Sequence, residues 1–169
     1  MKERITAFRV YGDGDVLFGV ADVTLPNIET MSDTVKGAGI AGEIDSPSIG
    51  LFGSMTLGFT WRTVTKEAAL LMAPGLHSLD IRGNIQEFDE TRGEYKQVPL
   101  KIFVQGLPKK LEGGKLEQNA AMDAPQEFEV VYYKKTLEGR DLVEIDKYNY
   151  VYKVMGIDRL AQVRRNLGM

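Results

Sequence analysis

The chain has 169 residues, of which 43% are hydrophobic and 27% charged. It is therefore long enough to bury a hydrophobic core, and the composition excludes a largely disordered chain. The absence of cysteine excludes disulfides, thiolate nucleophiles and cysteine-ligated metals. The net charge of −3, with no run of more than two basic residues, argues against a nucleic-acid-binding domain, which gains most of its affinity from phosphate neutralisation.

We expect a single domain over residues 1–169, in line with the usual size of domains. No membrane anchor is predicted, because the longest nearly apolar stretch, residues 68–76, contains Pro74-Gly75 and is too short to span a bilayer. Charged residues interrupt the N-terminal segment too often for the apolar part of a signal peptide.

Strand signals dominate the first third of the chain. Residues 5–11 and 16–25 flank the turn-forming residues 12–15 and predict a hairpin. Residues 28–36 are polar and are expected to form an edge strand. Residues 37–50 are rich in glycine and are expected to form a long loop, a feature that is usually functional or disordered in a compact domain.

The middle of the chain gives the clearest local signals. Residues 54–63 alternate between apolar and polar side chains, which predicts a half-buried strand with Met55, Leu57, Phe59 and Trp61 on one face. Residues 65–73 predict a helix that Thr65 caps and Pro74-Gly75 ends. We expect the apolar face of this helix to cover a sheet.

The remainder of the chain predicts further antiparallel strands. Hairpins are expected at residues 76–89 with 95–105 and at 126–137 with 141–145; a loop is expected at 106–114, and residues 115–122 are either strand or irregular. A stripe of Tyr148, Tyr150 and Tyr152 indicates one face of another strand. A short C-terminal helix at residues 159–166 is expected, with Asp158 as its N-cap.

These elements predict a mainly β fold, a β-sandwich or barrel of antiparallel sheets with one packed internal helix and a short C-terminal helix. Most connections between the predicted strands are short turns, which join antiparallel neighbours.

One sequence pattern resembles a nucleotide site. Residues 37–42 fit G-x-G-x-x-G, which binds a dinucleotide only between a hydrophobic strand and a helix. The residues before it are polar, and Pro47 disfavours a helix after it. We therefore interpret residues 37–42 as a glycine loop.

Other candidate chemistry is equally weak. Asp13-Gly14-Asp15 lacks the further oxygen ligands of a calcium loop and is interpreted as a turn. His77 is the only histidine, and without cysteine it cannot form a histidine-rich metal site or most catalytic triads. We assign no catalytic, cofactor-binding or metal-binding residue and predict that the protein is not an enzyme.

Short blocks in a fixed order along nearly the whole chain carry a family resemblance. The blocks are residues 8–11, 19–23, 25–26, 34–43, 45–47, 52–57, 61–62, 93–96, 98–101, 108–110, 114–117, 144–149, 156–158, 160–161 and 167–168. Through them the sequence resembles the major tail tube proteins of P2-like contractile phages, the FII family, and is also similar to R-type pyocin tube proteins.

The resemblance implies a structural role in a tail tube. Six subunits would form a ring, rings would stack into a tube, and strands of all six would join around a bore that conducts DNA in a phage or ions in a bacteriocin. Its partners would be other copies of the chain, a contractile sheath protein, and tape-measure, baseplate hub and tube terminator proteins. The protein would be assembled in the host cytoplasm and reside in the virion tail or tail-like particle.

Two groups of residues are candidate contact sites within such a tube. We expect the long glycine loop to contact a neighbouring subunit or ring through Lys36, Gly37, Gly39, Gly42, Glu43, Asp45 and Pro47. Glu87 and Asp89 lie two apart in a predicted strand and therefore on one face. They could form an acid–base pair, but a solvated face is more typical, and in a tube this face could line the bore and repel DNA phosphates.

Two alternatives stay open on the sequence. A secretion-system tube of the related hexameric type would share the architecture. A carbohydrate-binding β-sandwich module would instead be a monomer with exposed aromatic residues near its loops, whereas Trp61 is predicted to lie within a buried strand face.

Overall fold

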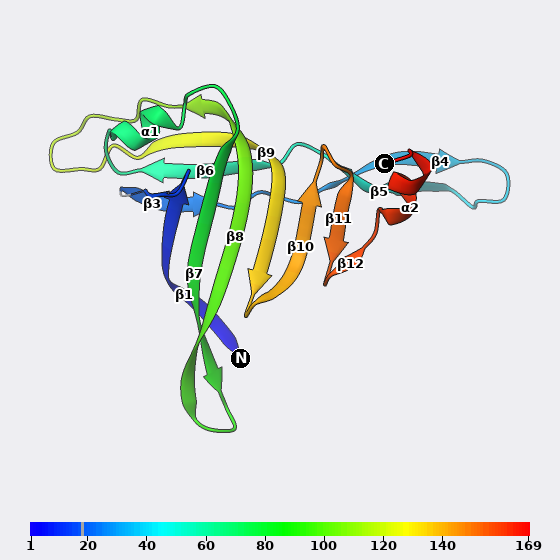
Figure 1. The fold of residues 1–169 in the computed structure, drawn as a ribbon, viewed down its shortest axis with the longest axis horizontal. Helices are drawn as coiled ribbons and strands as arrows, with labels where there is room; N and C mark the ends of the chain where they lie inside the picture. Colours follow the sequence, from blue (N-terminus) through cyan, green and yellow to red (C-terminus); the bar gives the residue numbers. More distant parts are fainter. Residues whose placement is uncertain (18) are drawn as a thin grey trace.

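The computed structural model describes residues 1–17 and 19–169 and is mainly β, as predicted. Its largest element is an antiparallel sheet that runs vertically in Figure 1. In order across the sheet, the strands are β12 (Ile157–Asp158), β11 (Val151–Val154), β10 (Arg140–Asp146), β9 (Ala124–Leu137), β8 (Glu94–Leu111), β7 (His77–Asp89), β1 (Lys2–Gly12) and β2 (Asp15–Val16).

A long two-stranded ribbon crosses this sheet. Its first part pairs β3 (Val20–Thr24) with β6 (Thr56–Trp61), and its second part pairs β4 (Thr30–Lys36) with β5 (Glu43–Phe52). The amide of Gly53 donates to the carbonyl oxygen of Glu29 at 2.9 Å and connects the two parts. The ribbon runs horizontally in Figure 1, and the β4–β5 hairpin, here called the arm, projects beyond β11 and β12.

β9 belongs to both layers. Its first half pairs with β6, with Leu57 opposite Phe128, and its second half pairs with β10, with Tyr133 opposite Ile145. The neighbouring strand β8 changes register at Gly106, where a Cβ atom would lie 3.0 Å from Phe128 Cβ. Glycine thus permits the close approach that lets β8 and β9 turn from one layer into the other.

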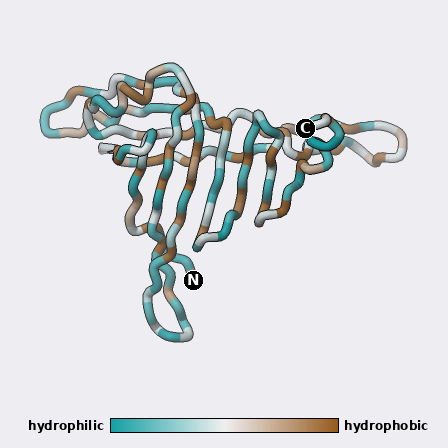
Figure 2. The backbone as a smooth tube through the Cα atoms, viewed as in Figure 1, coloured by the Kyte–Doolittle hydropathy of each residue, from teal (hydrophilic) through white to brown (hydrophobic). Residues whose placement is uncertain are grey.

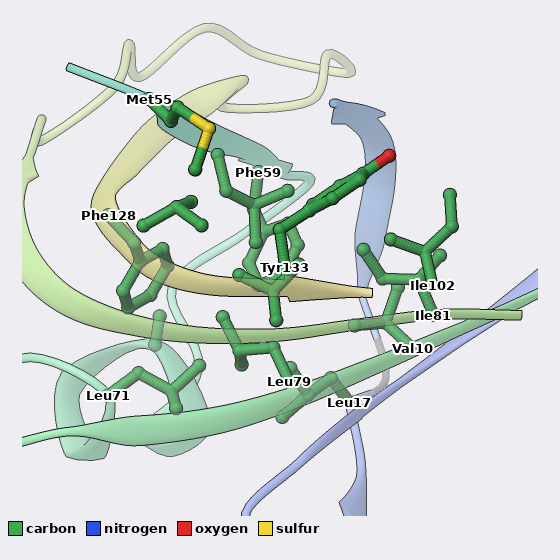
Figure 3. Close-up of a cluster of buried hydrophobic side chains, with 14 of the residues drawn as sticks. Val10, Leu17, Met55, Phe59, Leu71, Leu79, Ile81, Ile102, Phe128 and Tyr133 are labelled. Carbon is green, nitrogen blue, oxygen red and sulfur yellow. The ribbon is translucent and has the colours of Figure 1, made fainter. Parts of the chain in front are cut away.

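The core lies between the ribbon and the large sheet. Met55, Leu57, Phe59 and Trp61 are each at most 1% exposed, which confirms the alternation predicted for this strand. Facing side chains come from the large sheet, as Figure 3 shows. They include Val10, Leu79, Ile81, Ile102, Val104, Phe128, Val130, Tyr133 and Ile145.

Helix α1 (Lys66–Leu70) closes one end of this core and is shorter than predicted. Thr65 caps it as expected, because its Oγ1 accepts from the amide of Ala68 at 3.2 Å. The buried side chain of Gln126 connects the helix to the sandwich: its Nε2 donates to Ala68 O at 3.1 Å, and its Oε1 accepts from Trp61 Nε1 at 2.8 Å.

The first predicted hairpin is only partly correct. Asp13 and Gly14 form the turn, both at positive φ. Among the described residues, however, the returning strand pairs with β1 at Tyr11 and Gly12 and then makes one further backbone hydrogen bond, from Leu17 to Val10. The following residues form β3, which pairs with β6 instead. Pairing in the second layer packs Val23 and Leu25 against the core, and local turn signals do not contain that information.

The predicted long loop is also wrong over residues 43–50, which form most of β5. Only residues 37–42 connect β4 to β5. The arm is exposed on both faces, so its sequence lacks the alternation that indicates a strand. Pro47 lies opposite Ser32, and a two-stranded ribbon tolerates proline because its outer edges need no ladder hydrogen bonds.

Three smaller expectations differ from the structure. β8 continues to Leu111 through the predicted loop at 106–114, because it follows β9 into the second layer. Tyr148 and Tyr150 lie in the turn before β11, so they do not share a strand face with Tyr152. Helix α2 (Ala161–Asn166) begins after Leu160, and Asp158 lies in β12, where it pairs with Arg164 instead of capping the helix.

Candidate functional site

The arm contains the residues predicted from sequence to contact other subunits. Lys36 and Glu43 close the hairpin as a register pair, with Nζ 3.8 Å from Oε1. Gly37, Gly39 and Gly42 in the connection all have positive φ, a conformation that glycine adopts without strain. Asp45 lies opposite Thr34, and Pro47 opposite Ser32, along the same hairpin. No helix follows residues 37–42, so their glycine pattern lacks the framework of a dinucleotide site.

The arm exposes apolar side chains. Val35 and Ile44 are register partners on one face of the hairpin, and they are 45% and 53% exposed. Met31, Ile49 and Leu51 are similarly exposed along it, and hydrophobic segments are visible on the arm in Figure 2. An isolated two-stranded hairpin is at best marginally stable in water, so a surface of this kind is typical of a binding element.

The root of the arm is firmly attached. Phe52 packs edge-on against Tyr152 with ring centroids 4.9 Å apart. Lys147 Nζ donates to the carbonyl oxygen of Gly53 at 2.9 Å. Gly50 has a positive φ and lies directly against the buried side chain of Leu160. These contacts fix the direction in which the arm leaves the body, while the outer part has no such support.

A polar cluster lies beside the same root, around the carboxylate of Glu129. Ser54 Oγ donates to it at 2.6 Å, and Lys109 Nζ and Lys147 Nζ lie 3.4 and 3.6 Å away. Burial alone would raise the pKa of Glu129, but these hydrogen bonds and the lysine charges outweigh it and lower that pKa. The cluster ties β6, β8 and β9 together and has the composition of a structural ion-pair network.

His77 makes another structural contact, with Asp13 on one side and Ala73 on the other. Its Nδ1 lies 2.7 Å from Asp13 Oδ2, and its Nε2 lies 2.8 Å from the carbonyl oxygen of Ala73. Burial lowers the pKa of His77, but these two acceptors outweigh the burial and raise it. The imidazole therefore links the β1–β2 turn to the segment after α1.

The predicted acidic pair is remote from the arm. Glu87 and Asp89 lie in the β7–β8 hairpin, which extends from the opposite end of the large sheet (Figure 1). Glu87 lies opposite Lys96, and Asp89 Oδ1 accepts from the amides of Thr91 and Arg92 in the turn. Asp89 is thus engaged in stabilising the hairpin turn, and the structure does not bring this pair together with the predicted arm residues.

A second exposed surface was not identified from sequence: the outer edge of β1. Here β1 pairs with β7 on one side. On the other side, the contacts with β2 and Leu17 among the described residues reach Gly12, Tyr11 and Val10. We call residues 2–9 along this open side the β1 edge. Ile5 and Phe8 are 55% and 43% exposed on it. The sequence indicated a strand here but gave no sign of which neighbours it would have.

No group of three or more histidine, aspartate or glutamate residues could hold a metal ion among residues 1–17 and 19–169. Over the same residues, no helix is long and apolar enough to cross a membrane. Trp61 is buried, so it offers no exposed ring for a carbohydrate.

A β-rich protein with an open strand edge and an uncovered projecting hairpin has surfaces suited to contacts with other protein chains. Comparison with known proteins identifies the family to which the chain belongs. The model of the family "Phage tail tube protein FII" matches residues 2–168. The chain is also 30% identical over 178 aligned residues to the tail tube protein of Escherichia phage P2, covering 100% of this chain and 99% of that protein. The chain belongs to the phage tail tube protein FII family, and it is a structural protein of phage tails.

Proposed function

We propose that this chain is the subunit of the inner tube of a contractile phage tail or a phage-tail-like particle, and that six copies form rings that stack into the tube. The observation that carries this proposal is the full-length similarity to the tail tube protein of phage P2. Residues 1–169 act as one domain in this proposal.

Two features of the fold support assembly with other copies. The β1 edge offers backbone groups without a strand partner among the described residues, and an open edge is a template for pairing that a closed ring removes. The arm carries apolar side chains that no other described element covers. Contacts between different surfaces of identical subunits generate rings when the rotation closes and stacks when it does not.

The bore of such a tube would conduct DNA in a phage or ions in a bacteriocin-like particle. A subunit with net charge −3 and no long basic run would not hold DNA through many phosphate contacts. Bore-facing positions for Glu87 and Asp89 remain part of the proposal, although Glu87 lies opposite Lys96. A map of the assembled tube with these carboxylates away from the bore would overturn that assignment.

The proposed partners follow from the same role. They are a contractile sheath protein around the tube, and tape-measure, baseplate hub and tube terminator proteins at its interior and ends. Assembly would take place in the host cytoplasm, and the finished protein would reside in the tail.

The test is negative-stain electron microscopy of the purified protein, together with its size-exclusion profile over a range of concentrations. Rings or hollow tubes of uniform width are expected. A strict monomer that forms no tube even when a purified baseplate is added would overturn the proposal.

The contribution of the arm is tested in the same assay by deleting residues 37–46. Loss of stacking with a folded subunit is expected. Unchanged tubes would show that the arm makes no essential contact.

A further inference from the structure

The arm and the β1 edge lie on opposite sides of the molecule. In Figure 1, β1 is at one margin of the large sheet, and the arm projects beyond the margin formed by β11 and β12. Both surfaces lack a partner among the described residues, and neither can reach the other within one copy. When copies are arranged side by side in the same orientation, the projecting element of each one meets the opposite margin of the next.

A mostly apolar pocket lies beside the β1 edge. A pocket of about 160 Å³ opens between β1, β3 and the large sheet. Phe8 and Ile5 form part of its wall and stay largely exposed. The lining is otherwise apolar except for one carboxylate, and it consists of Ile5, Phe8, Asp22, Val23, Leu25, Ile81, Gly83, Leu100 and Ile102. A pocket of this size accepts one or two aliphatic side chains.

The arm presents aliphatic side chains of the right kind. Val35 and Ile44 lie directly opposite each other near its tip, so their side chains share one face. Burial of two such side chains stabilises a contact substantially, and docking would also supply the second layer that a lone hairpin lacks.

The charges of the two surfaces are opposite in sign. The arm, residues 30–52, contains three carboxylates and one lysine, a net charge of −2. The β1 edge, residues 2–9, contains three cations and one carboxylate, a net charge of +2. Arg9 and Arg62 line a common groove along the β1 edge. Opposite potentials of this kind orient and select a partner.

We propose that the arm of one copy docks on the β1 edge of a second copy, with Val35 and Ile44 at the pocket beside Phe8 and the acidic residues of the arm near Arg9 and Arg62. The proposal rests on the proposed function only in that the partner is another copy of this chain. It assigns the receptor surface for the arm and makes the contact heterologous, with each copy using one surface as donor and the other as acceptor.

Because the chain contains no cysteine, introduced cysteines can test this contact directly. Ala7→Cys labels the β1 edge and Ser46→Cys labels the arm, on the face that carries Ile44. The two single-cysteine proteins are mixed, assembled, treated with a short bismaleimide and analysed by mass spectrometry of the linked peptides. Ala120→Cys, at an exposed position in the loop between β8 and β9, replaces Ala7→Cys in the control mixture.

We expect the Ala7–Ser46 link to form at least about tenfold more than the Ala120–Ser46 link, a ratio that corresponds to about 1.4 kcal/mol. Tubes with equal yields of the two links would overturn the docking while leaving the proposed function intact. The specific link in assemblies that are not tubes would support the docking and count against the proposed function. Monomers without the link would overturn both.

Charge reversal gives a second, independent test. Arg9→Glu on the edge-labelled protein is expected to reduce the Ala7–Ser46 link by about tenfold. Asp33→Lys on the arm-labelled protein, on the face of the arm that carries Val35 and Ile44, should restore part of the yield when the two variants are mixed. Equal yields in all combinations would overturn the electrostatic part of the proposal.

Discussion

Gln126 is the buried polar residue whose replacement tests the architecture most directly. Its side chain is fully buried and bonds Trp61 Nε1 and Ala68 O, at 2.8 and 3.1 Å. Gln126→Met keeps a similar volume but leaves a buried indole N–H and a buried carbonyl oxygen without their partner. Each unsatisfied group costs about 1–3 kcal/mol, so we expect a loss of about 3 kcal/mol in the free energy of unfolding.

A loss of that size is large against the ~5–15 kcal/mol that stabilises a typical domain. In a chain of this length, 1 kcal/mol shifts the melting temperature by roughly 2–4 °C. Gln126→Met should therefore lower it by about 6–12 °C in a thermal unfolding assay monitored by circular dichroism. Gln118→Met, at an exposed position of the loop between β8 and β9, is the matched control and should change it little.

A double-mutant cycle identifies the partner. In a Trp61→Phe background the indole donor is already absent, so Gln126→Met should cost about 1 kcal/mol less than in the unmodified chain. If Gln126→Met unfolds at the same temperature as the Gln118→Met control, the amide does not join the helix to the sandwich and the argument fails.

Three further predictions concern stability and pH. His77 has a raised pKa in the folded state. Its contacts with Asp13 and Ala73 therefore stabilise the fold fully below the ordinary pKa of 6.5, and this stabilisation is lost as the pH rises through the folded pKa. The melting temperatures of the protein and of His77→Asn should converge at alkaline pH. Glu129 has a lowered pKa, so Glu129→Gln should remove stability that is present above the ordinary value of 4.5 and is lost on acidification. Gly106→Ala places a methyl group 3.0 Å from Phe128 Cβ and should reduce the free energy of unfolding, measured by urea titration, by about 1–3 kcal/mol.

Each of these has a result that contradicts it. A constant difference between the protein and His77→Asn from pH 5.5 to 9 would show that the imidazole does not stabilise as a cation. A stability difference for Glu129→Gln that grows on acidification would reverse the sign of the argument. Gly113 has no atom near its potential Cβ, so Gly113→Ala is the control for Gly106→Ala, and equal effects would show that close packing is not the cause.

Local patterns determined the elements that have one buried and one exposed face. The strand with Phe59 and Trp61 was predictable because alternation has the same period as the strand. The cap at Thr65 was predictable because it involves only the amide of Ala68, within the first turn of the helix. The family resemblance was likewise present in the sequence, since it depends on the order of short blocks.

The candidate site was only partly predictable. The residues of the arm were identified, since glycine at 37, 39 and 42 and Pro47 distinguish the segment. Its conformation was not, because a ribbon exposed on both sides has no hydrophobic period to read. The β1 edge was missed, since nothing in residues 2–9 shows that the following strand pairs with β6 and leaves that edge open.

The sequence by itself determined the fold class, most strands, both helices and the absence of cysteine chemistry, because these depend on composition and on neighbours a few residues away. The two later hairpins were predictable from their turns, but the tertiary structure alone decided that β3 and β9 pair with β6, how β9 joins two layers, and that His77 meets Asp13. Such contacts depend on the simultaneous packing of distant segments, and their free energies arise from burial that no local pattern records. The placement of the arm and of the open β1 edge on opposite margins of the molecule is of this kind.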